Sequence, residues 1–470
     1  MLHRADGRGD FFGYVERLKE TIRVRMESDD HFLSLAQRAL AGDVLAIATS
    51  SKEIEKHIRQ TPYTGRIPES YSGFSLTEAI YQEWLGFSVV APWFLNRSYA
   101  NSGKMQIIGT SVAVATDGEY QPYPYAFHSV ERVSQLMRTL ARQDERVRID
   151  PNSPSAEFKL DDPLWPGRFV RVAMWIPPRT WHGYPVITFR RKVVEQMSLD
   201  DQAGSGLIAP ETASVFSSLS QLYPNLIISG PVDSGKTTFA DTLVAEQLKH
   251  AGIALGVILI ENHPESTLPL AKVARSHRVT PLIANPDELM EVGIESLRHD
   301  PDVIYMSEMR WGEWLFYNFA GEKGYRGLIG TYHTTDAEDI PYQGANAAYA
   351  TGGGSLRGHL LGVLKSVEIV AVLMPLANGK KKLVRLSEIR YDPGAVPQVY
   401  ANDWIRFDFD NQCWTYNADI SPVLWERMTR VNRALAERFR AALAGLAAAH
   451  PMASPIVPSR KCQAVLGVQS

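Results

Sequence analysis

Residues 230–237 carry the clearest chemical pattern in the sequence. They read Gly-Pro-Val-Asp-Ser-Gly-Lys-Thr, which matches the pattern Gly-x-x-x-x-Gly-Lys-Ser/Thr. In such a loop the glycines let successive backbone N–H groups point at phosphate oxygens, beside the positive end of the next helix. The lysine reaches the β- and γ-phosphates, and the hydroxyl that follows it binds Mg²⁺. The candidate nucleotide-binding residues are therefore Gly230, Pro231, Val232, Asp233, Ser234, Gly235, Lys236, Thr237 and Thr238.

The segments around this loop are those that the motif requires. An apolar run at 226–229 predicts a strand before the loop, and residues 238–250 predict a helix after it. A strand, a glycine loop and a helix in that order form the context in which this motif binds a nucleotide. The alternative is a glycine turn that binds nothing.

Three further polar residues follow predicted strands of the same region. They are Glu261, Glu308 and His333. In open α/β sheets, ligands bind at the carboxyl ends of the strands, so these side chains are expected near the phosphates. Hydrolysis needs carboxylates that hold Mg²⁺ and orient water, which makes Glu308 and Glu261 the candidates for both duties. The alternatives are a helix cap or a solvated charge for each acid, and a structural hydrogen bond for His333.

Two kinds of pattern divide the chain into domains. Short β runs around one amphipathic helix favour an α+β domain, and the later alternation of apolar strands with helices favours an α/β domain with a mainly parallel sheet. The α/β strands are predicted at 226–229, 255–260, 303–306 and 328–332, followed by an antiparallel edge hairpin of 367–374 and 382–389. The predicted domains are a helical N-terminal extension (1–64), the α+β domain (65–192), the α/β domain (193–395), and a C-terminal extension (396–470) with one helix and a mobile tail.

The composition excludes several classes of protein. The 470 residues include 49 Lys+Arg and 52 Asp+Glu, a net charge of −3, which does not support a generic nucleic-acid-binding surface. Two cysteines, Cys413 and Cys462, cannot form a four-cysteine zinc site. The longest apolar runs reach about half of the roughly 20 residues that a membrane-spanning helix needs, and the first residues do not resemble a secretory signal. The sequence therefore predicts a cytoplasmic protein without a transmembrane segment.

The order of these motifs resembles the secretion-superfamily ATPases. These are the hexameric traffic motors of type IV secretion, conjugation, type II secretion and type IV pili. Their Walker A loop, Asp box, Walker B segment and His box are similar to residues 230–237, 260–265, 302–310 and 327–336. The lack of a four-cysteine zinc module and the overall layout favour the type IV secretion and conjugal-transfer branch.

The resemblance implies a fold, an activity and partners. It implies an α/β, RecA-like P-loop motor domain preceded by a smaller α+β domain, and Mg²⁺-dependent hydrolysis of ATP. It also implies a homo-hexamer at the inner membrane, peripheral and on the cytoplasmic side, bound to membrane-embedded proteins of a secretion or pilus apparatus. Direct binding of nucleic acid is not supported.

The same resemblance implies roles for individual residues. Glu308 would orient the attacking water, with Glu261 as second choice, and His333 would sense the γ-phosphate. Arg171 and Arg190 lie in runs that resemble the family's two arginine-bearing strands, from which arginines reach the nucleotide and neutralise phosphate charge. The alternative for both arginines is a solvated charge on a strand.

Two other classes of protein share part of this pattern. A different P-loop motor, such as a helicase or a DNA-packaging ATPase, would carry the same core. A catalytically weak nucleotide-binding scaffold is the second alternative. It is motivated by Asn262, where the family commonly has an aspartate, and by Trp311, where an acid often follows Arg310.

Overall fold

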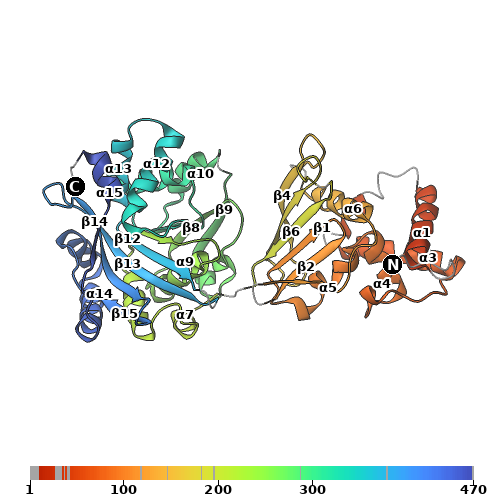
Figure 1. Ribbon diagram of the computed structural model, residues 1–470, viewed down its shortest axis with the longest axis horizontal. Helices are drawn as coiled ribbons and strands as arrows, with labels where there is room; N and C mark the ends of the chain where they lie inside the picture. Colours follow the sequence, from red (N-terminus) through yellow and green to blue (C-terminus); the bar gives the residue numbers. More distant parts are fainter. Residues whose placement is uncertain are drawn as a thin grey trace. The chain divides into compact units, whose positions relative to one another are not determined.

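The chain divides into two units, residues 1–193 and 194–470, in a computed structural model (Figure 1). Each unit is described by itself. The structure describes residues 10–26, 34–35, 38–39, 43–116, 119–144, 147–181, 183–193, 196–285, 287–376 and 379–467. No helix in these ranges is long and apolar enough to cross a membrane.

An antiparallel six-stranded sheet is the centre of the first unit, as far as its residues are described. The strand order is β3-β2-β1-β6-β5-β4. Every second side chain of β5 and β6 is buried, so one face of the sheet lies on a core and the other carries both polar and apolar residues that are less buried. The strands are β1 (Lys104–Ile108), β2 (Ser111–Thr116), β3 (Glu119–Pro122), β4 (Ser155–Asp161), β5 (Phe169–Trp175) and β6 (Val186–Arg191).

Helices cover the apolar face of this sheet and complete one hydrophobic core. The helices are α1 (Phe11–Met26), α3 (Val44–Gln60), α4 (Leu76–Trp84), α5 (Ala91–Leu95) and α6 (Val130–Ala141). The core joins Val172 and Phe189 of the sheet with Leu136 of α6, Ile80 of α4 and Leu18 of α1. The described helices of the first 60 residues therefore share a core with the α+β sheet.

A larger, mainly parallel sheet is the centre of the second unit. Its strand order is β15-β14-β13-β12-β7-β11-β10-β8-β9, and β16 also pairs with β14. Strands β9, β8, β10, β11, β7 and β12 pair in parallel, and those from β13 onward pair antiparallel. The strands are β7 (Leu226–Ser229), β8 (Gly256–Glu261), β9 (Arg278–Ile283), β10 (Val303–Met306), β11 (Leu328–Tyr332), β12 (Ile369–Pro375), β13 (Lys381–Tyr391), β14 (Val399–Asp408), β15 (Cys413–Tyr416) and β16 (Ile456–Pro458). Three predicted strands are confirmed at their predicted bounds, and the one predicted at 255–260 begins and ends one residue later.

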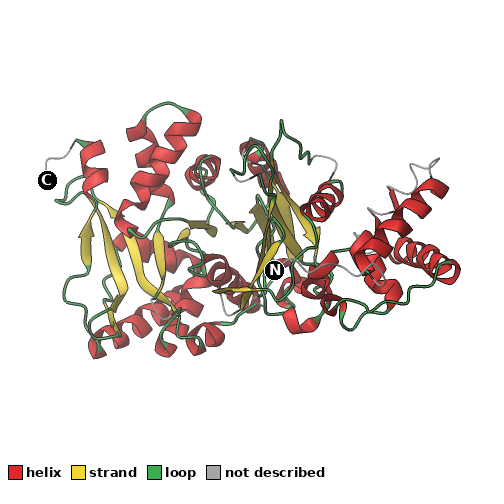
Figure 2. Cartoon of the chain, turned by 45° about the vertical axis from the view of Figure 1, so that its right-hand side comes forward, coloured by secondary structure: helices red, strands yellow, loops and turns green. Residues whose placement is uncertain are grey.

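Helices lie on both faces of this sheet, which makes a three-layer α/β arrangement (Figure 2). Ile228 of β7 packs with α8, α9 and α14, whereas its neighbour Ile227 packs with α10–α13 and α15 on the other face. Successive side chains of a strand point to opposite faces, so a continuous apolar run such as β7 suits a sheet covered twice. The helices are α7 (Leu199–Gly204), α8 (Ala213–Ser220), α9 (Lys236–His250), α10 (Leu289–Ser296), α11 (Gly312–Glu322), α12 (Ile340–Gly352), α13 (Leu356–Ser366), α14 (Pro422–Ala449) and α15 (Arg460–Leu466).

The prediction for residues 396–470 is wrong in two respects. This segment supplies β14, β15 and β16 as well as α14 and α15, and Cys462 of α15 is fully buried, so the predicted single helix and mobile tail are replaced by ordered structure. The hairpin of β12 and β13 is consequently not at the edge of the sheet. The sequence pattern does not predict strand β14, because two buried polar residues, Asn402 and Asp403, interrupt its apolar run. Asp403 is tolerated there because Arg385 of β13 neutralises it.

Candidate nucleotide-binding site

The glycine loop connects β7 to α9, as the motif requires. Gly230 has a φ of 146° and Gly235 a φ of 94°, conformations that favour glycine. A Cβ on Gly230 would lie 2.1 Å from the backbone oxygen of Leu373 and 2.7 Å from Ser234 Oγ. The loop therefore packs closely against β12, and only glycine fits at its first position.

The side chain of Lys236 lies across this loop. Its Nζ donates hydrogen bonds to the backbone oxygens of Gly230 at 3.0 Å and Pro231 at 2.8 Å. Burial lowers the pKa of Lys236 to about 8, against the opposing effect of nearby carboxylates, first among them Glu308. A buried ammonium on an anion-binding loop is suited to a phosphate group, because the negative charge of the phosphate would offset the cost of burying the ammonium.

Other residues of the loop and of the first turn of α9 complete the cradle. Val232 and Asp233 are exposed, whereas Thr237 and Thr238 are half-buried. Within the described residues, Ser234 Oγ is buried and has no hydrogen-bond partner. A buried hydroxyl without a hydrogen-bond partner is costly, and a phosphate oxygen could accept a hydrogen bond from it. These features fit a nucleotide with Mg²⁺, for which Thr237 offers the hydroxyl ligand.

Glu308 and His333 come together beside Lys236. His333 follows β11, and its Nδ1 lies 3.3 Å from Lys236 Nζ, while its Nε2 lies 3.4 Å from Glu308 Oε1. Arg310 donates to both carboxylate oxygens of Glu308, at 3.0 and 3.1 Å from its Nη2. Burial and the charge of Lys236 lower the pKa of His333, which favours its neutral form. The structure thus brings three predicted site residues into one chain of contacts.

Glu261 is held by its own loop. It ends β8, is 4 % exposed, and its Oε1 accepts backbone N–H groups of Glu265 and Ser266, both at 2.9 Å. Burial raises the pKa of Glu261, whereas these N–H groups and the Ser307 hydroxyl act in the opposite direction. These bonds hold the loop after β8 and do not cap a helix, and the role of Glu261 as a Mg²⁺ ligand stays a prediction.

Asp241 is a structural partner of the site that the sequence motifs do not include. It lies one helical turn after Thr237 and is 1 % exposed. It accepts hydrogen bonds from Ser266 Oγ at 2.6 Å, from the backbone N–H of Thr267 at 2.8 Å and from the Tyr305 hydroxyl at 3.0 Å. Asp241 therefore joins α9, β10 and the loop after β8. An acid inside the apolar part of a helix that follows a glycine loop is the signal that points to it.

We expect Asp241→Asn to lower the free energy of unfolding by about 1–3 kcal/mol, because an amide cannot accept all of these bonds. Chemical denaturation followed by circular dichroism measures the change. Tyr305→Phe removes only the hydroxyl, and the double variant should lose less than the sum of the two single losses, because the two residues share a bond. Additive losses would contradict a direct contact between Asp241 and Tyr305.

Arg171 and Arg190 lie side by side in the first unit. Arg171 of β5 is opposite Arg190 of β6, and Lys104 of β1 and Lys159 of β4 extend the same row. Arg171 also forms an ion pair with Glu157, and Arg190 is exposed. Four basic side chains thus cross the less buried face of this sheet. The predicted contact of Arg171 and Arg190 with the nucleotide stays a prediction.

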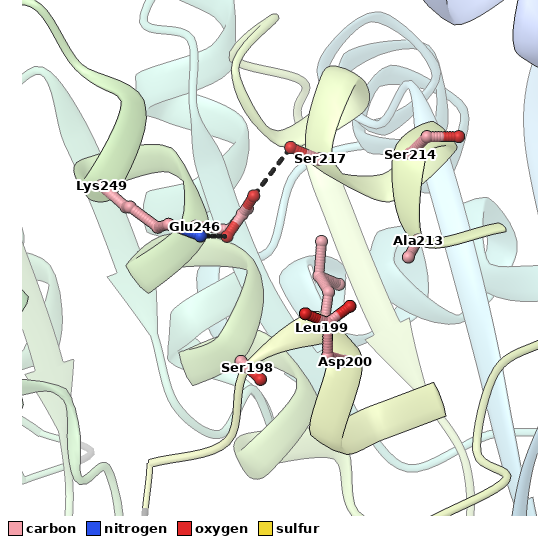
Figure 3. Close-up of a pocket in the computed structure, with 8 residues that line it drawn as sticks. All are labelled: Ser198, Leu199, Asp200, Ala213, Ser214, Ser217, Glu246 and Lys249. Carbon is pink, nitrogen blue, oxygen red and sulfur yellow. Dashed lines mark hydrogen bonds and ion pairs between the residues drawn. The ribbon is translucent and has the colours of Figure 1, made fainter. Parts of the chain in front are cut away.

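A small pocket lies on α9 away from the loop (Figure 3). Its volume is about 170 Å³, below the roughly 300–1,000 Å³ of most ligand pockets. Glu246, ten residues after Lys236, accepts a hydrogen bond from Ser217 Oγ at 2.7 Å. At about 1.5 Å per helical residue, this contact is roughly 15 Å along α9 from Lys236. The lining residues are Ser198, Leu199, Asp200, Ala213, Ser214, Ser217, Glu246 and Lys249.

One family model matches the central part of the chain. Residues 133–364 match the family described as "Type II/IV secretion system protein". The resemblance to the secretion ATPases is thereby confirmed. The matched residues of this chain include the glycine loop, Glu308 and His333, and they end before β12.

Individual relatives belong to type IV secretion and conjugation. The type IV secretion system protein VirB11 of Bartonella henselae is 26 % identical over 262 residues, which are 47 % of this chain and 71 % of VirB11. The conjugal transfer protein TrbB of Rhizobium radiobacter is 29 % identical over 153 residues, 33 % of this chain and less than half (46 %) of TrbB. Among solved structures, the Legionella pneumophila ATPase DotB is 14 % identical with a TM-score of 0.45, covering 79 % of this chain and 93 % of DotB.

Proposed function

We propose that this chain is a Mg²⁺-dependent ATPase that powers a type IV secretion or conjugal-transfer apparatus. The observation that carries the proposal is the convergence of Lys236, His333 and Glu308 at the carboxyl ends of neighbouring strands. Those side chains supply a phosphate-binding cation and a carboxylate that can orient water, which phosphoryl transfer to water uses, and an imidazole that lies between them. The secretion-family match and the names of the VirB11 and TrbB relatives support the apparatus. The second unit would be a RecA-like motor domain.

The residues divide the work by their positions. Lys236 would hold the β- and γ-phosphates, and Thr237 would hold Mg²⁺, which neutralises phosphate charge when it is bound. Glu308 would accept a hydrogen bond from the attacking water and orient it. Its carboxylate is now paired with Arg310, so that pair must loosen before water can be held. His333 contacts both Lys236 and Glu308, and would report the presence of the γ-phosphate to the acid.

The proposed motor is an assembly of several copies. We infer a homo-hexamer, peripheral on the cytoplasmic side of the inner membrane, that binds membrane-embedded proteins of the apparatus. The loss of phosphate would change how the two units of each chain engage the nucleotide, with Arg171 and Arg190 as the contacts from the first unit. This motion would transmit the energy of hydrolysis to the apparatus.

Phosphate release and particle mass test this function on the purified full chain. We expect steady phosphate release from ATP in MgCl₂, loss of release in excess EDTA, and a six-chain mass by light scattering with a non-hydrolysable ATP analogue. A monomer under all conditions would contradict the motor. Tight ATP binding without phosphate release would favour the scaffold alternative, and strong stimulation by DNA would favour a helicase or packaging ATPase.

A further inference from the structure

The hairpin of β12 and β13 lies against the glycine loop. Strand β12 pairs in parallel with β7, so its end reaches the same edge of the sheet as the loop. The backbone oxygen of Leu373 closes on Gly230, and a Cβ built on Gly235 would lie 3.4 Å from Lys381 Cδ. Both glycines of the motif are therefore in contact with this hairpin, and the second one with the stem of a lysine.

Lys380, Lys381 and Lys382 are consecutive, and β13 begins at the second of them, Lys381. Lys382 lies with its Nζ 4.5 Å from the ring centre of Trp414, and burial, followed by the charge of Lys380, lowers its pKa. Side chains of a strand alternate between faces, so Lys381 and Lys382, the first two residues of β13, point to opposite sides. Burial is the main cause of the lowered pKa of Lys236, and the positive charge of Lys381 lowers it slightly further. Lys381 is thus the lysine of this triplet that faces the glycine loop.

Lys236 and Lys381 are like charges near one loop, and the carboxylates of Glu308, Glu265 and Asp233 offset part of the charge of Lys236. A phosphate anion between the two lysines would be attracted to both. The loop already offers an anion site through its backbone N–H groups, and phosphates of a nucleotide carry several negative charges. We propose that Lys381 is a second phosphate-binding lysine, which contacts the phosphate chain of the nucleotide beside Gly235. The proposal rests on the proposed function as far as nucleotide binding. Lys381 lies beyond the region matched to the secretion family, so the family match does not assign it a role.

Nucleotide titrations of matched lysine variants test this contact. The full chain and the variants Lys381→Ala and Lys380→Ala are titrated with ATP and with AMP by calorimetry in a Mg²⁺ buffer of low salt. A contact to the phosphate chain should weaken ATP binding about 5- to 20-fold in Lys381→Ala, as expected for one charge-assisted hydrogen bond, and leave AMP binding within twofold. Lys380→Ala should remain within twofold of the wild type for both nucleotides, since it removes the same charge from the neighbouring residue, whose charge acts on Lys382.

Salt and a conservative variant sharpen the result. The defect of Lys381→Ala should shrink at high salt because exposed charges are screened, and Lys381→Arg should retain most of the affinity for ATP. An affinity of Lys381→Ala for ATP within twofold of the wild type overturns the proposal, as does an equal loss in Lys380→Ala. If Lys381 only neutralises a loop carboxylate such as Asp233, the variant changes thermal stability and leaves ATP affinity unchanged, which also overturns it. If the wild-type chain binds no ATP, nucleotide binding itself is refuted. That outcome differs from a failure of the Lys381 contact alone, in which the wild type binds ATP and Lys381→Ala binds it equally well.

Discussion

Lys236→Ala is expected to lower ATP turnover at least 100-fold and to abolish measurable ATP binding. The reason is that Nζ is the buried cation at the mouth of the loop, held on the backbone oxygens of Gly230 and Pro231. Loss of that charge removes stabilisation of the γ-phosphate in both the bound state and the transition state. Phosphate release and ATP titration measure the two effects. Lys249→Ala is the matched control, because Lys249 is a largely exposed lysine at the far end of the same helix.

The same residue predicts a pH dependence of stability. The pKa of Lys236 is about 8 in the folded chain against an ordinary value of 10.5, so the fold disfavours the charged lysine. That cost is fully present below pH 8 and disappears as pH rises from 8 toward 10.5. We therefore expect Lys236→Met to unfold at no lower temperature than the wild type at pH 7, with any advantage narrowing above pH 8. A much less stable variant at pH 7 would show that the lysine supports the fold and would weaken the activity test.

Glu308→Gln is expected to bind ATP within a few-fold of the wild-type affinity and to hydrolyse it at least 100-fold more slowly. Glutamine has nearly the same size, but it carries no charge and cannot take a proton from water. It also weakens the pair with Arg310 and the contact with His333, which the charge now supports. Single-turnover phosphate release separates this loss from any change in binding.

Glu261→Gln is the informative comparison for Glu308. Both residues are acids at strand ends, but the carboxylate of Glu261 already accepts two loop N–H groups. A glutamine oxygen can accept those bonds, so we expect Glu261→Gln to lose no more than about tenfold in turnover, roughly 1.4 kcal/mol in the barrier. A larger loss in Glu261→Gln than in Glu308→Gln would reverse the roles that we assign to the two acids.

The predictions that agree with the structure rest on local patterns. The strand before the loop is a continuous apolar run, and the glycines of the motif adopt backbone angles that other residues avoid. Such features depend on neighbours in the chain, so a short stretch of sequence is enough to identify them. The positions of Glu308 and His333 follow from a single topological rule, because parallel strands end at the same edge of the sheet.

The contacts that the sequence did not reveal join residues far apart in the chain. Asp241 meets Tyr305, 64 residues later, and neither belongs to a recognised motif. Glu261 is the last residue of β8 and Glu308 lies two residues after β10, and only the fold of the loop after β8 shows that Glu261 Oε1 accepts two backbone N–H groups. Residue type predicts which chemistry is possible, whereas the competition among local hydrogen-bond partners decides which chemistry is available.

The C-terminal segment shows the same division most clearly. Two of its residues hold the segment that follows His333. Asp339 of that segment accepts a hydrogen bond from Ser459 Oγ at 3.0 Å and forms an ion pair with Lys461 at 2.8 Å. Glu338 pairs with Arg385 of β13 at 2.6 Å. The partners of these two acids are 47 to 122 positions away in the chain, so no local sequence pattern points to them.

The sequence alone determined the phosphate loop, the α/β pattern and the acids and histidine at strand ends, because each depends on residue types within a short span. Tertiary structure alone decided that Glu308 contacts His333, that Glu261 is held by its loop and that Lys381 reaches Gly235. The physical reason is that buried charge and hydrogen-bonding groups must find partners, and strand pairing brings those partners from distant parts of the chain.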